Sequence, residues 1–132
     1  MQIIDQAPSL TLGKQNDQFV GCSANIIVNK ATIAKPNGNK VYFLRLFGDV
    51  EFSLNNRIIN MKIGITESDL GPLFVNKGKS DFFIYPDGAL SKLMDAMGII
   101  DVAEFNGKKL PIMNNQKGFW VIHINGFKKI LN

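Results

Sequence analysis

The feature that most constrains the fold is an alternation of side-chain character through residues 41–47. Successive side chains of a β-strand point to opposite faces. One face would carry Tyr42, Leu44 and Leu46. The other would carry Val41, Phe43, Arg45 and Phe47. The first face can enter a core whole, whereas an arginine between two phenylalanines is costly to bury. The pattern predicts a strand with one buried and one available face; the alternative is a strand buried on both sides, from which Arg45 reaches solvent.

The segments around this strand predict a curved antiparallel ribbon. Residues 19–28 alternate in the same way, with Gly21 as the expected bend or bulge. A strong turn signal follows at residues 35–39, because Pro presets φ and Asn-Gly tolerates positive φ. Residues 19–34 and 40–47 are therefore predicted to pair. Further strands are predicted at 50–54 and 58–65, joined by a turn at Asn55-Asn56, with Ile59, Met61, Ile63 and Ile65 facing inward.

The second half of the chain predicts one helix between short strands. Residues 66–80 are rich in turn signals and form a candidate flap, and residues 81–85 form a short aromatic strand. The helix begins at Asp87 as N-cap and ends at Gly98. Its apolar stripe consists of Leu90, Leu93, Met94 and Met97. The stripe fits a helix that plugs the end of a barrel, or a partner surface. Ile99 and Ile100 should tuck under the helix end, and residues 119–124 form the last strand.

The order of these elements resembles an oligonucleotide-binding (OB) barrel, in which a coiled sheet is closed by a helix. The predicted fold class is mainly β: an antiparallel OB-like barrel of about five strands with one short helix. The 132 residues fit a single domain, 1–132, with no structure expected for residues 1–8. An edge strand near residues 9–12 or at the carboxyl end could pair between chains, which leaves a homo-oligomer open.

Several signals bear on the compartment. Cys22 is the single cysteine, so an internal disulfide is excluded, and its apolar strand face favours a core position. The first six residues lack the pattern of a signal peptide, and no apolar run is long enough to span a bilayer. We therefore expect a soluble cytoplasmic protein with no membrane partner, in the host cytoplasm if the chain is viral.

The charge is mildly basic. Fifteen Lys and Arg against eleven Asp and Glu give a net charge of +4, which favours polyanionic partners without requiring one. Two segments, residues 30–45 and 108–132, carry basic residues and no acidic ones. We expect them to meet on one electropositive face; the alternative is that the lysines lie in turns because turns are solvated.

Flat aromatic faces beside cations suit the stacking of unpaired bases and the neutralisation of phosphates. The candidate stacking residues are Phe43 and Phe47, with Tyr85 and Phe119 as further candidates. The candidate phosphate contacts are Lys30, Lys40, Arg45 and Lys62. These residues predict sequence-nonspecific binding of single-stranded nucleic acid. The alternative is a small viral structural or interaction protein that binds another protein through the same sheet face.

Catalysis finds little support in the residues. His123, the only histidine, has no cysteine or histidine nearby in sequence to complete a metal site. Gly78-Lys79-Ser80 lacks the upstream glycine and the strand-to-helix context of a phosphate-binding loop. We expect no enzyme activity, no catalytic or metal-binding residue and no cofactor.

A more specific resemblance rests on three segments: the strand pair split by the Lys-Pro-Asn-Gly turn, residues 90–99 (Leu-Ser-Lys-Leu-Met-Asp-Ala-Met-Gly-Ile), and residues 105–110 (Phe-Asn-Gly-Lys-Lys-Leu). Together they resemble small phage-encoded single-stranded DNA-binding proteins. The resemblance implies a protein that coats unpaired DNA, with DNA preferred over RNA, during replication or recombination. Bacterial-type relatives end in an acidic tail that recruits partners, whereas residues 127–131 here are apolar and basic. The departure puts recruitment by a tail in doubt and favours self-association or DNA contact by that end.

Overall fold

The computed structural model describes residues 19–35 and 41–131, with side chains described as far as Phe127. The expectations for residues 1–8 and 9–12, for most of the turn at 35–39 and for Lys40 fall outside the described residues.

Two long strands come first, β1 (Ser23–Ala34) and β2 (Tyr42–Leu54). The remaining elements, in chain order, are β3 (Arg57–Ile65), β4 (Glu67–Ser68), β5 (Gly71–Pro72), β6 (Phe74–Lys77), β7 (Phe82–Ile84), α1 (Ala89–Met97), the 3₁₀-helix η2 (Val102–Phe105), β8 (Lys109–Asn114), β9 (Trp120–Ile122) and α2 (Ile124–Leu131).

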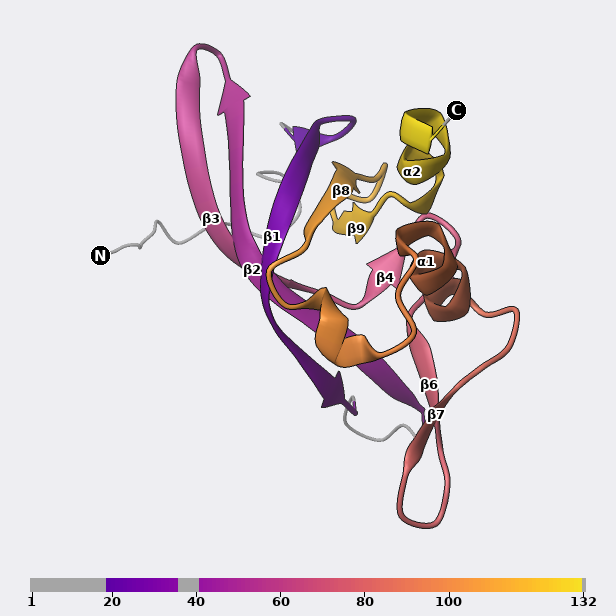
Figure 1. Cartoon of the computed structure of the whole chain (residues 1–132). Coiled ribbons are helices and arrows are strands. Elements are labelled where there is room, and N and C mark those ends of the chain that lie inside the picture. Colours follow the sequence, from indigo (N-terminus) through magenta and orange to yellow (C-terminus); the bar gives the residue numbers. More distant parts are fainter. Residues whose placement is uncertain (1–18, 36–40, 132) are drawn as a thin grey trace.

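The strands form one open, mixed sheet, which confirms a mainly β fold (Figure 1). Its order is β5-β4-β9-β8-β1-β2-β6-β7, and β3 pairs with β2. The closed antiparallel barrel of about five strands is not observed. Among the described residues β3 pairs only with β2, and β4 meets β9 through one parallel residue pair, Ser68 with Ile122. A continuous ladder is therefore missing where a barrel would close.

The predicted pairing of the first two strands is confirmed. β1 and β2 are antiparallel from Asn25–Glu51 to Ala34–Phe43, and a bulge interrupts the register between Val28 and Lys30. The extra residue changes the parity of the strand, so that Lys30 shares a face with Phe47 instead of following Val28 into the core. Gly21, expected at a bend or bulge, has φ +83° in the turn before β1.

β2 runs without a break through Gly48 and continues into β3 by a two-residue turn. Asn55 and Asn56 have φ values of 52° and 65°, as the mirror-image turns of tight hairpins require. Gly48 is buried, and a Cβ there would collide with the backbone of Ile27, so the glycine allows β1 to approach β2. The inward positions of β3 are less exposed than their neighbours, as predicted, although only Ile65 is fully buried.

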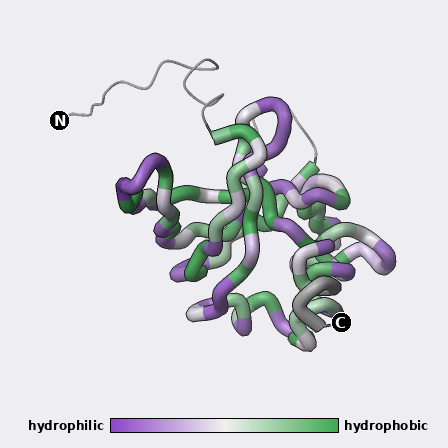
Figure 2. The backbone as a smooth tube through the Cα atoms, turned by 90° about the horizontal axis from the view of Figure 1, so that it is seen from above, coloured by the Kyte–Doolittle hydropathy of each residue, from purple (hydrophilic) through white to green (hydrophobic). Residues whose placement is uncertain are grey.

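The core lies between the curved sheet and α1, and it draws on most strands. Its fully buried large side chains include Ile26, Leu44, Leu46, Ile65, Leu90, Leu93, Phe105, Leu110, Ile112 and Ile122. In Figure 2 the most hydrophilic segments lie in loops at the margin of the molecule. Leu90, Leu93 and Met94 of α1 enter this core, so the apolar stripe packs inside the protein rather than forming a partner surface.

The helix boundaries differ from the prediction. Asp87 has φ 63° and is not the N-cap of α1; Gly88 takes that position without a side-chain hydrogen bond, while Gly98 ends the helix in the left-handed region as expected. Ile99 is buried, but Ile100 is 91% exposed and does not tuck under the helix.

Two helices were not predicted. Residues Ile124 to Leu131, expected as a strand end and a basic tail, form α2. η2 is fixed by a capping box, in which Asp101 Oδ1 accepts a hydrogen bond from Ala103 N and Glu104 Oε2 accepts one from Asp101 N. None of the helices in the described part of the chain has the length and apolarity needed to cross a membrane.

Candidate nucleic-acid interface

The side of β1, β2 and β3 that is turned away from the core, called the outer face below, brings several predicted site residues together. Phe43, Arg45 and Phe47 occupy alternate positions of β2 on this face. Arg45 is exposed, and the two phenylalanines are half-buried. The strand is therefore not buried on both sides, and the predicted division between a core face and an available face is confirmed.

Arg45 and Phe47 form a cation–π pair over a glycine. The guanidinium carbon lies 5.7 Å from the centre of the Phe47 ring. Gly64 of β3 is paired with Phe47, and a Cβ at this position would lie 2.9 Å from Phe47 Cε1 and 3.1 Å from Arg45 Cδ. The missing side chain at Gly64 thus leaves room for both groups to lie flat over β3.

Phe43 stacks against Phe74, which was not among the candidate stacking residues. Its ring centre lies 5.1 Å from that of Phe74, with 31° between the ring planes, and the two residues are paired between β2 and β6. Phe74 is 38% exposed. It lies in the stretch predicted as a flap, where a phenylalanine between turn signals was the available clue. Phe43, Phe47 and Phe74 thus form one aromatic row on the outer face.

Basic side chains border this row. Lys30 of β1 is paired with Phe47 and exposed. Farther along the outer face, Lys62 is paired with Asp49, and Asp49 is paired in turn with Ile27. Lys109 of β8 is paired with Ile27, which precedes the first basic segment, so no strand pairing among the described residues joins the two basic segments directly.

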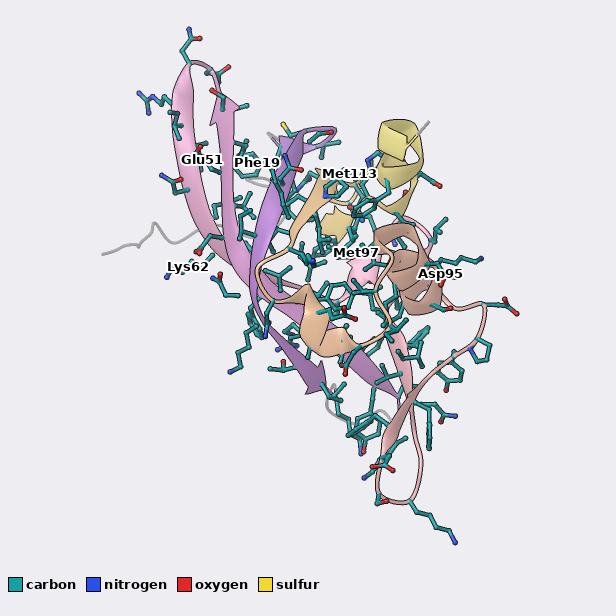
Figure 3. The ribbon with its side chains drawn as sticks, in the orientation of Figure 1. Phe19, Glu51, Lys62, Asp95, Met97 and Met113 are labelled. Atoms are coloured by element: carbon teal, nitrogen blue, oxygen red, sulfur yellow. The ribbon has the colours of Figure 1, made fainter. Side chains whose placement is uncertain are left out.

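Carboxylates also lie on the outer face, so it is not uniformly electropositive. Asp49 Oδ2 accepts a hydrogen bond of 2.9 Å from the Asn29 side chain at the bulge. In Figure 3, Glu51 and Lys62 lie along the β2–β3 ribbon on the side away from the helices. A groove of about 720 Å³ crosses this part of the face, and its lining includes Asn25, Asp49, Glu51, Asn60, Lys62 and Lys109. The face therefore has an aromatic, basic end beside β6 and a mixed polar end beside the β2–β3 turn.

Two predicted residues lie apart from the aromatic row. Tyr85 is exposed in the segment that joins β7 to α1. Phe119 is 59% exposed and precedes β9, where it lines a groove of about 460 Å³ with the end of β3 and the two residues that follow it, residues 63–67. That groove borders the edge of β3 not paired with β2, so the two aromatic regions flank β3 from opposite sides.

The single histidine belongs to a structural arrangement. His123 Nε2 lies 3.8 Å from Asp69 Oδ2. The same carboxylate accepts hydrogen bonds from the backbone N–H groups of Ile124 and Asn125, at 2.8 and 3.2 Å. Asp69 therefore caps the start of α2 from a turn far away in sequence.

Comparisons of the chain with protein-family models, with curated proteins and with solved structures gave no match.

Proposed function

We propose that the protein binds single-stranded nucleic acid, DNA in preference to RNA, on the aromatic, basic end of the outer face. The observation that carries the proposal is the row of Phe47, Phe43 and Phe74 with Arg45 and Lys30 beside it. All three phenylalanine side chains remain partly accessible to solvent, although apolar core positions lie next to them in the strands. A core does not need this face, because the opposite side of β2 supplies Leu44 and Leu46 to it.

The chemistry of the row favours unpaired strands. Every base has a π-face, so stacking on phenylalanine tolerates any sequence, and each stacked base contributes about 1–3 kcal/mol. A duplex hides these faces within its own base stack. Lys30 and Arg45 supply positive charge for the phosphates that link stacked bases.

The strand connections support an OB-like arrangement for the same face. β2 lies between β1 and β3, β1 also pairs with β8, and β8 pairs with β9, while α1 precedes β8. The parallel pair between β4 and β9 lies where an OB barrel, itself partly open, would bring its edges together. OB folds bind oligonucleotides on the face formed by their second and third strands, which corresponds to β2 and β3. A role in coating unpaired DNA during phage-type replication or recombination follows as part of the proposal.

The experiment is fluorescence anisotropy of a labelled oligonucleotide of about thirty nucleotides, single-stranded or in a duplex, titrated with protein at rising salt. We expect strand-selective binding that weakens steeply with salt, because phosphate contacts release counterions. Absence of binding at low salt would contradict the proposal and favour the other candidate, a protein partner on the same apolar surface. Such an interface would be far less sensitive to salt.

A further inference from the structure

We propose that the β6–β7 hairpin extends the binding surface, so that a bound strand runs from β2 over Phe74 to Phe83. The proposal rests on the proposed function and adds a second set of contacts to it. Phe83 of β7 is 55% exposed and belongs to none of the candidate residues predicted from the sequence.

The hairpin is attached to the sheet at its base and projects beyond it. β6 pairs with β2 only at Val75–Tyr42 and Phe74–Phe43, and Leu44 N donates a hydrogen bond to Leu73 O just before this pairing. In Figure 1 the hairpin extends at the end of the molecule opposite to the β2–β3 turn.

The strand pairings put Phe83 on the same face as the aromatic row. Phe74 is paired with Phe43, and Asn76, two residues along β6, is paired with Phe83. Side chains two apart in a strand share a face, and so do directly paired residues. Phe43, Phe74 and Phe83 therefore face one side across three neighbouring strands, and with a strand spacing of about 4.8 Å the row extends roughly 10 Å across the sheet from β2 to β7.

The opposite side of the hairpin is already occupied by contacts within the protein. The Phe82 ring packs edge-on against Tyr42, with 5.3 Å between ring centres. Lys35 Nζ and Lys77 Nζ lie 5.4 and 5.5 Å from the centre of the same Tyr42 ring. Phe82 thus packs against the protein, whereas its neighbour Phe83 lies on the opposite side of the hairpin.

Phe83 is held in place without being covered. Its ring lies over Gly78, where a Cβ would collide with it, and Gly78 N donates a hydrogen bond of 2.7 Å to Asp81 O across the turn. A ring that is already ordered loses little conformational entropy when a base stacks on it. Lys77 and Lys79 against Asp81 give the hairpin a net positive charge, although Lys77 lies on the Tyr42 side, so the charge acts on a phosphate backbone through the overall field of the hairpin rather than through a contact of Lys77.

The test measures the affinity of the whole protein for thymidine oligonucleotides of about 4 to 16 nucleotides. Wild-type affinity should rise with length and then level off. For Phe83→Ala we expect levelling at a shorter length and binding of the longest oligonucleotides weaker by about 5- to 100-fold, with the shortest bound as by the wild type. Phe83→Trp should restore the wild-type length dependence, because it keeps a stacking surface.

Phe82→Ala is the matched control, since it removes the same ring from the other side of the hairpin, and it should level off at the wild-type length. Wild-type affinity of Phe83→Ala for every length, or an equal loss at every length, would overturn the hairpin proposal and leave the β2 site standing. If the wild type bound no oligonucleotide at all, the proposed function itself would fail.

Discussion

At the scale of single residues, Arg45 lies at the junction of three strands on the outer face. It lies where β3 stops and β6 begins to pair with β2, and its side chain covers Gly64 beside the Phe47 ring. A guanidinium can stack on an aromatic face and still donate hydrogen bonds to phosphate from its edge. One residue can therefore serve both the base and the backbone of a bound strand.

Replacing Arg45 by glutamine should weaken binding of single-stranded DNA and lower the slope of log affinity against log salt by about one, because one phosphate contact is lost. Arg57→Gln is the matched control: it removes the same charge from an exposed position at the β2–β3 turn. Salt titrations of both variants check this. Equal slopes for the two would mean that only net charge matters.

Gly64→Ala tests whether the arrangement of Arg45 and Phe47 matters. The added Cβ should displace the end of the Phe47 ring and the Arg45 chain, since it would lie within 3.1 Å of both. We expect several-fold weaker DNA binding with nearly unchanged stability, because the position is exposed and the neighbours are side-chain atoms that can move. Asn60→Ala, on the same side of β3, is the control. Unchanged binding by Gly64→Ala would count against a preorganised pair.

At the scale of elements, the course of the first three strands was predictable, although β2 was predicted as two strands, and the only helix end predicted correctly was that of α1 at Gly98. Alternation specifies a strand from its own residues, so the faces of β2 and the Asn55-Asn56 turn followed directly from the sequence. The bulge at Asn29 was not predicted, although the alternation breaks there, because Lys30 is polar at the position where another inward apolar side chain would follow Val28. The placement of Phe74 beside Phe43 depends on a pairing between distant segments, which local pattern does not encode.

The unpredicted helices illustrate two different causes. The Asp101–Glu104 capping box of η2 is a local signature, so the sequence itself contains the signal for the start of this helix. The cap of α2 could not be predicted from the local sequence, because Asp69 supplies it from more than fifty residues away. Tertiary contact thus decides where the last strand ends and α2 begins.

Asp69→Ala should lower the free energy of unfolding by about 1–2 kcal/mol, because two N–H groups at the start of α2 lose their acceptor. Asp69→Asn keeps one acceptor oxygen and should lose less. Chemical denaturation of the two variants measures the difference. An unfolding curve of Asp69→Ala identical to that of the wild type would show that the cap contributes nothing.

At the scale of the whole molecule, the sheet separates the core from the proposed binding face. Its concave side and α1 form the core, while the outer face of β2 carries aromatic and basic groups that the core does not use. The open sheet also leaves the β6–β7 hairpin free to extend this face. Binding and folding should therefore respond to different substitutions.

The most direct test of the binding face is Phe47→Ala, with affinity for a single-stranded oligonucleotide and the free energy of unfolding measured on the same preparation. We expect binding weaker by about 1–3 kcal/mol and a much smaller change in stability. Ile100→Ala, which trims a 91% exposed apolar side chain elsewhere, should change neither. Unchanged affinity for Phe47→Ala, or a loss of about 3–5 kcal/mol of stability as for a core phenylalanine, would contradict the assignment of the outer face as the binding site.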